Sequence, residues 1–335
     1  MIRAACILAL LVVGASAPAS GGQEAEQLLW PRAPAQARIE FVRTVSRAAD
    51  LGIGKGFLER VKDLLFGAAD ERMVRPMAVV ASAGILFVAD TGAGCVHRFD
   101  TLAGDYARIG ADDGKPLPSP VGLARGADGE IYVADSVRAQ VLVIRPGTRV
   151  ASPLSLGITL KQPTGLAFDR AGRRLYVADT GEHRIHVFEA DGSLAGSIGK
   201  RGTGAGEFNF PTYIWRRPEG ELYVTDALNF RIQTFDAAGN FLGRFGRQGD
   251  GVGDTARPKG IATDRHGHVY LVDALLHAFQ IFDATGHLLL PVGERGQDRG
   301  EFWLPTGIFI DDDLIYVADT YNQRIQVFRF IGGAT

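Results

Sequence analysis

Six aspartates recur at nearly even spacing along this chain, and carboxylates placed so regularly could act as acids, bases or metal ligands. Each ends a short apolar run such as Tyr176-Val177-Ala178, and they stand 44 to 47 residues apart: Asp90, Asp135, Asp179, Asp226, Asp273 and Asp319. In three cases an arginine follows five residues later, at Arg184, Arg231 and Arg324. A carboxylate and a guanidinium that face each other across a turn form a charge-assisted hydrogen bond. Because these pairs recur with the period, we interpret them as structural ties and predict no catalytic residue.

Histidine could supply a different chemistry, since catalytic zinc is usually held by three protein side chains. Only His183 and His277 follow the repeated aspartates closely enough to share their loops. Glu182, Asn229 and Asn322 lie on the same loops, but they form no nucleophile–base pair. We therefore predict no metal site and no cofactor. A metal-dependent hydrolase or lyase built from these loops is the alternative.

The even spacing itself predicts the fold, because a fixed period of this length is typical of repeat architectures. A proline recurs in step with each aspartate, at Pro76, Pro120, Pro163, Pro211, Pro258 and Pro305. Each repeat contains four short alternating segments separated by turn residues, and the chain holds 43 glycines. We predict an all-β fold, a six-bladed β-propeller of four-stranded blades over residues 76–332.

The sixth repeat shows which known repeat the pattern resembles. It reads Pro305-Thr306-Gly307, then Tyr316-Val317-Ala318-Asp319, then Asn322-Gln323-Arg324-Ile325-Gln326-Val327-Phe328. This sequence closely resembles the NHL repeat, and the resemblance extends over residues 76–330. It implies a propeller that binds its targets through the loops around the central channel.

The same resemblance bears on catalysis and on partners. A peptide lyase of this family places zinc-binding histidines directly after several of the repeated prolines. Here those positions hold Met77, Val121, Thr164, Thr212, Lys259 and Thr306, so a zinc lyase is disfavoured. Exported bacterial members sometimes accompany multihaem electron-transfer proteins, a partnership that only the resemblance suggests.

The two ends of the chain are expected to close the propeller. The sixth repeat stops near residue 332 without a fourth strand, and an unpaired edge favours aggregation. Residues 37–46 have strand character, and we predict that they supply this missing strand. Residues 20–36 are expected to be a linker, and residues 47–75 a connector with a short helix at 57–66, where apolar residues recur at helical spacing.

The first nineteen residues predict export. A short basic start precedes an apolar run that is too short to span a membrane, and Ala17-Pro18-Ala19 offers a cleavage site. We expect residues 1–19 to be a signal peptide, with a periplasmic or secreted product that has no membrane span. The net charge of −2 gives no basic excess for nucleic acid.

One group of loops predicts a binding surface. The loops after the aspartates are apolar only in repeats 4 and 5, and aromatic residues precede or begin nearby inner strands. Adjacent exposed apolar side chains mark contact sites for proteins or apolar ligands. The predicted patch consists of Tyr213, Leu228, Phe230, Leu275, Leu276 and Trp303. Packing of Leu228, Phe230 and Leu275 between blades would explain the same pattern. We interpret the chain as a non-enzymatic binding or scaffold propeller with a protein partner in the exported compartment.

Overall fold

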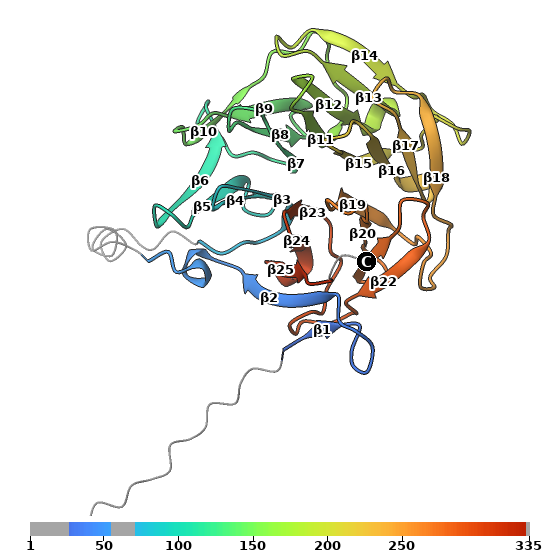
Figure 1. Cartoon of the computed structure of the whole chain (residues 1–335). Helices are drawn as coiled ribbons and strands as arrows, with labels where there is room; N and C mark the ends of the chain where they lie inside the picture. The colour runs from blue at the N-terminus through green and yellow to red at the C-terminus, as the bar shows by residue number, and fades with distance from the viewer. Residues whose placement is uncertain (1–26, 55–70, 333–335) are drawn as a thin grey trace, which may run out of the picture.

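The fold is a ring of β-sheets around a central axis, as Figure 1 shows. The computed structural model describes residues 27–54 and 71–332. We number the repeats 1 to 6 from the proline that begins each one. The predicted signal peptide (1–19), the predicted helix (57–66) and the first part of the predicted linker, residues 20–26, lie outside the described residues.

Within each repeat the strands follow one another as an antiparallel meander, from an inner strand at the axis to an outer strand. The strands of repeats 1 and 2 are β3 (Pro76–Ser82), β4 (Ile85–Asp90), β5 (Cys95–Asp100), β6 (Asp105–Ala111), β7 (Pro120–Arg125), β8 (Ile131–Asp135), β9 (Gln140–Ile144) and β10 (Val150–Pro153). Those of repeats 3 to 5 are β11 (Pro163–Asp169), β12 (Arg174–Asp179), β13 (Arg184–Phe188), β14 (Leu194–Ile198), β15 (Pro211–Arg216), β16 (Leu222–Asp226), β17 (Arg231–Phe235), β18 (Phe241–Phe245), β19 (Pro258–Thr263), β20 (Val269–Asp273), β21 (Ala278–Phe282) and β22 (Leu288–Val292).

Repeat 6 is completed from the other end of the chain. Its own strands are β23 (Ile308–Asp311), β24 (Leu314–Asp319) and β25 (Arg324–Phe330), and they are joined by β1 (Leu29–Trp30) and β2 (Ile39–Val45). β2 pairs antiparallel with β25, from Ile39 opposite Phe330 to Val45 opposite Ile325. The predicted closing strand is confirmed. β1 adds a further strand, which lies within the stretch predicted as a linker.

The sheets are fewer than the six separate blades that the sequence predicts. The structure has three four-stranded sheets, one five-stranded sheet and one eight-stranded sheet. The eight-stranded sheet forms because the outer strands of repeats 1 and 2, β6 and β10, pair in parallel at Val150 and Ala151. The chain is a β-propeller in which two neighbouring repeats share one sheet.

Apolar side chains pack between neighbouring repeats and account for the ring. In five of the six repeats the third strand carries a fully buried phenylalanine near its end. These residues are Phe99, Phe188, Phe235, Phe282 and Phe328. Trp30 and Phe41 pack edge-on against Phe328 with ring centroids 5.7 and 5.6 Å away. The N-terminal strands therefore complete the core of repeat 6 as well as its hydrogen bonding, and burial of such rings is a large stabilising contribution.

In four repeats the inner strand approaches its neighbour closely because a glycine stands two residues after the repeated proline. A Cβ on Gly122 would collide with the carbonyl oxygen of Thr164, and one on Gly307 would lie 2.6 Å from that of Met77. Hydroxyl groups add bonds between repeats, such as Thr306 Oγ1 to the Met77 carbonyl at 2.9 Å. That bond joins repeat 6 to repeat 1 at the closure of the ring.

Short 3₁₀ helices stand at the turns: η1 (Ala48–Leu51), η2 (Thr180–Glu182), η3 (Ala227–Asn229) and η4 (Thr320–Asn322). Among the described residues, no helix is both long and apolar enough to cross a membrane.

Candidate functional site

The two ends of the ring differ in the segments that form them. We call one end the loop face: it carries the segment before each inner strand and the loop after each repeated aspartate. Backbone hydrogen bonds join these two segments, as from Leu228 N to Asn209 O at 3.0 Å and from Tyr321 N to Trp303 O at 3.2 Å. The other end, the turn face, carries the turns between inner and second strands.

The repeated aspartates hold the loop face together, as predicted. Asp226 is fully buried and accepts hydrogen bonds from Asn209 N, Asn229 Nδ2, Arg231 Nε and Gln233 Nε2. Asp319 has the same kinds of donors in repeat 6. Burial raises the pKa of Asp319 above its ordinary value, against the lowering effect of those bonds. A buried acid whose oxygens are occupied by donors of its own repeat and of the segment directly before it is a structural group.

The paired arginines are held by the preceding repeat as well. Arg231 donates to the carbonyl oxygens of Thr203, Gly204 and Glu207 at 2.7 to 2.9 Å. Arg324 donates in the same way to those of Asp298 and Glu301. These carbonyls belong to glycine-rich segments that lead into repeats 4 and 6.

The prediction that Asp179 pairs with Arg184 is wrong. Asp179 accepts from the backbone N–H groups of Lys161, Gln162 and Glu182. Within the described part of the chain Arg184 makes no ion pair with it; its Nε lies 3.9 Å from a Glu182 oxygen instead. Repeat 3 has Glu182 where repeats 4 and 6 have an asparagine donor, and a different segment precedes it. Arg184 therefore lacks both the neighbouring asparagine and the backbone carbonyl acceptors that accompany Arg231 and Arg324.

The other three aspartates accept backbone N–H groups of their own loops, without an arginine. Asp90 accepts from Val74, Arg75 and Ala93. Asp135 accepts from Ser119, Val137 and Arg138, and Asp273 from Ala256, Arg257, Leu275 and Leu276. In repeat 1 a fully buried histidine, His97, lies 3.3 Å from Asp90.

The polar loop residues considered for catalysis are engaged in the scaffold. His183 Nδ1 accepts from Phe210 N at 3.1 Å, and His277 Nδ1 accepts from Leu304 N at 3.2 Å. Each histidine thus links its repeat to the next. Asn229 and Asn322 donate to the aspartate of their own repeat. Across the described residues, no three His, Cys, Asp or Glu side chains are grouped so that they could hold a metal ion.

Most of the predicted patch lies on the loop face. Leu228 and Leu275 are each 52% exposed and Trp303 is 37% exposed, while Phe230 and Leu276 are half-buried. Tyr213 lies elsewhere: it occupies the position where four other repeats have glycine, and it lines the central cavity. Burial raises the pKa of its phenol.

The exposed apolar surface continues beyond the predicted residues. Tyr321 lies beside Trp303 with ring centroids 5.7 Å apart, and Phe210 and Val74 are also exposed on this face. Repeats 4, 5, 6 and 1 are neighbours in the ring. We call this set of exposed residues the apolar arc: Val74, Phe210, Leu228, Leu275, Trp303 and Tyr321. The added residues could have been found from the sequence, because every member of the apolar arc lies within two positions of the proline or the aspartate of its repeat.

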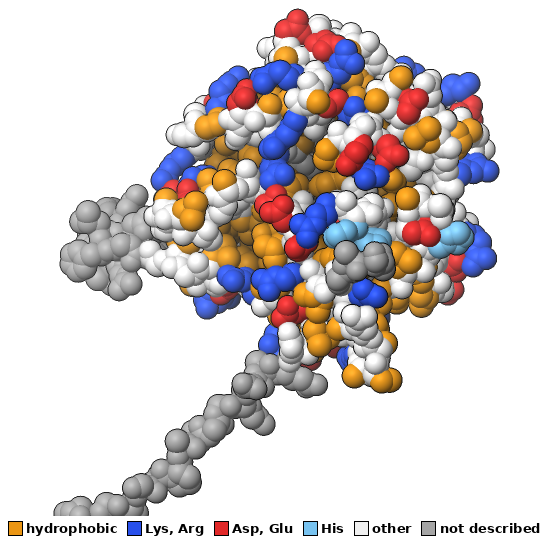
Figure 2. Space-filling view, viewed as in Figure 1, with side chains coloured by type: hydrophobic (Ala, Val, Ile, Leu, Met, Phe, Trp, Pro, Cys, Tyr) orange, Lys and Arg blue, Asp and Glu red, His pale blue; other side chains and the backbone are white. Residues whose placement is uncertain are grey.

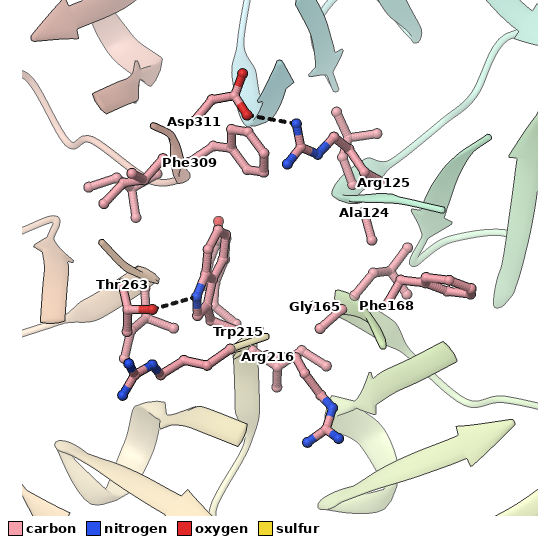
Figure 3. A pocket seen from close by; sticks show the side chains of 18 of the residues that line it. Ala124, Arg125, Gly165, Phe168, Trp215, Arg216, Thr263, Phe309 and Asp311 are labelled. Atoms are coloured by element: carbon pink, nitrogen blue, oxygen red, sulfur yellow. Dashed lines mark hydrogen bonds and ion pairs between the residues drawn. The ribbon is translucent and has the colours of Figure 1, made fainter. Parts of the chain in front are cut away.

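The central channel holds a cavity of about 510 Å³, and of the residues that line it Tyr213 alone was among the predicted site residues. It is lined by inner-strand residues of all the repeats and by the first residues of several turns, including Arg170, Arg217 and Arg265, so it opens toward the turn face. Figure 2 shows the molecule hollowed at the centre of the ring, and Figure 3 shows Trp215 standing in the cavity opposite Phe309 and Arg125.

Comparison with known proteins agrees with the repeat pattern. The NHL repeat matches residues 160–188 and 302–328. NHL-repeat-containing protein 4 of Mus musculus is 33% identical over 103 residues, which are 30% of this chain and 73% of that protein. The chain belongs to the NHL-repeat family.

Solved structures with a similar fold have different functions. An auxiliary nutrient binding protein from Bacteroides thetaiotaomicron VPI-5482 has a TM-score of 0.61 at 13% identity, covering 78% of this chain and 70% of that one. Virginiamycin B lyase from Staphylococcus aureus has a TM-score of 0.56 at 15% identity, covering 77% and 96%. At this identity the likeness concerns the propeller fold alone, because one fold hosts unrelated functions.

Proposed function

We propose that this NHL-repeat protein is an exported, non-enzymatic binding propeller that engages a protein partner through the apolar arc. In this proposal the propeller has six blades, the eight-stranded sheet counting as two. The observation that carries it is the exposure of Leu228, Leu275, Trp303 and Tyr321 on successive repeats of one face. Apolar patches with aromatic members at the centre are typical of protein contact sites.

The arc is presented on a fixed backbone, which favours binding. The loop of repeat 4 is held by the bond from Leu228 N to Asn209 O, and that of repeat 5 by two bonds to Asp273. A surface that is ordered before binding loses little conformational entropy when a partner docks. The same loops use their polar side chains for scaffold bonds, which supports binding over catalysis.

The test is co-purification of a partner from the native exported fraction, followed by affinity measurement with that partner. The variant Leu228→Asp/Leu275→Asp should lose the partner, with affinity at least tenfold lower. The matched control is Leu242→Asp/Leu289→Asp, because these two leucines are 54% and 52% exposed but lie on outer strands. A partner that binds both variants equally would refute the arc as the contact surface.

Two further measurements address the class of function and the compartment. The metal content of the purified mature protein should be far below one ion per chain, and a stoichiometric ion would favour the alternative hydrolase or lyase. The mass of the mature protein should show that it begins after residue 19. An uncleaved chain in the cytoplasm would contradict export.

A further inference from the structure

The central cavity has an aromatic surface held in a fixed position. Trp215 is half-buried on the inner strand β15 and donates from Nε1 to Thr263 Oγ1 at 2.9 Å. Its ring meets Phe309 edge-on at 5.7 Å. Phe309 is itself covered by the Arg125 guanidinium, 5.0 Å from the ring centroid. Trp215 therefore offers an ordered aromatic surface to anything that enters from the turn face.

The charges around this surface neutralise one another. Arg125 pairs with Asp311 at 2.7 Å and Arg216 with Asp169 at 2.7 Å, on opposite sides of the cavity. The turn arginines Arg217 and Arg265 are also paired, with Glu221 and Asp313. The lining as a whole holds five arginines and five acidic side chains, so it carries no net charge and the cavity favours an uncharged molecule.

The ion pair of Arg125 and Asp311 can still form hydrogen bonds with a ligand. Arg125 and Asp311 are 26% and 33% exposed. Among the described residues only Oδ1 of Asp311 receives a protein donor.

We propose that this cavity binds a neutral, polyhydroxylated ring, a mono- or disaccharide. The apolar C–H face of such a ring would pack on Trp215, while neighbouring hydroxyl groups would bond to Asp311 and Arg125, whose planar groups suit paired contacts. The volume of about 510 Å³ is ordinary for a small-molecule site. This site is separate from the apolar arc, because it opens on the other face of the ring.

The three tryptophans of the chain allow a direct test. In the Trp30→Phe/Trp303→Phe background, the remaining fluorescence reports Trp215. Titration with glucose, galactose, maltose and cellobiose should give a saturable change with at least one sugar, with a Kd on the order of 1 mM. Benzoate, a flat ring with a negative charge, and choline, a compact quaternary cation, should give none.

Matched variants make the result specific. Asp311→Asn should weaken sugar binding about tenfold, because it weakens a hydrogen bond to a charged acceptor. Asp128→Asn is the control, since Asp128 lies on a turn of the same face and pairs with Arg173, neither residue lines the cavity, and the affinity should be unchanged. Leu228→Asp/Leu275→Asp should also bind sugar normally. Absence of saturation by every sugar up to about 20 mM, or equal binding of benzoate or choline, would overturn the proposal.

Discussion

Repeats 3 and 6 have the same aspartate and arginine five residues apart, yet only repeat 6 forms the ion pair. In repeat 6, Arg324 Nε lies 2.7 Å from Asp319, and its Nη2 donates to two carbonyls of the segment before the repeat. In repeat 3, Arg184 is 40% exposed and lies nearest to Glu182. The difference shows that the arginine depends on the carbonyls of the preceding segment as much as on its own aspartate.

The largest loss of stability is expected when repeat 6 is deprived of the N-terminal strand that completes it. Deletion of residues 37–46 removes β2 and leaves β25 as an open edge. Loss of the fully buried Ile39 and Val45 alone would cost roughly 3–6 kcal/mol, at about 1.5–3 kcal/mol for each side chain. Thermal denaturation should show a much lower Tm. An unchanged Tm would mean that β2 does not stabilise the ring.

The same substitution of the arginine in repeats 3 and 6 measures how much each arginine stabilises the protein. Arg324→Met leaves the buried Asp319 carboxylate without its cation, so we expect a loss of about 3 kcal/mol in the free energy of unfolding. Arg184→Met should change it by less than about 0.5 kcal/mol, because the side chain is partly exposed and does not contact Asp179. Urea denaturation of the two variants measures the difference. Equal losses would show that the pair in repeat 6 adds nothing.

Repeat 1 should respond to pH, because it has His97 where repeats 4, 5 and 6 have glutamine. Burial lowers the pKa of His97, but the hydrogen bond to Asp90 and the neighbouring Cys95 outweigh it and raise the pKa from 6.5 to about 9. A pKa raised by folding stabilises the protein fully below about pH 6.5, and this contribution is lost as the pH rises through about 9.

We expect roughly 3 kcal/mol less stability at pH 9.5 than at pH 6 from this group. Urea denaturation at the two pH values measures it. His97→Gln should remove most of the difference, and Cys95→Ser tests whether the thiol contributes. A difference that survives His97→Gln would assign the pH dependence to another group.

The smallest effect on stability is expected on the loop face. Leu228→Asp/Leu275→Asp should change the free energy of unfolding by less than about 0.5 kcal/mol, because both side chains are half exposed. Urea denaturation measures this. A large loss would mean that these leucines pack between repeats, and the apolar arc would lose two of its members.

Much of the scaffold could be predicted because it depends on residues within one period. The spacing of proline and aspartate predicted the propeller, and the strand character of residues 37–46 predicted how it closes. Arg184 and Tyr213 were misplaced because their surroundings come from neighbouring repeats, where local sequence gives no warning. The lining of the central cavity was missed for the same reason: its walls are assembled from six distant inner strands, and Trp215, Phe309 and Arg125 come from three different repeats.

The pairing of β2 with β25 also has a consequence for how the chain folds. Val45 lies opposite Ile325, so two segments from opposite ends of the chain must meet before the ring is complete. Contacts this distant in sequence slow folding, and in a chain emerging from its amino end the edge of β2 that pairs with β25 stays open until the last strand has arrived. During that interval β2 has a free edge of β-structure, which makes it the segment most in need of protection by a chaperone.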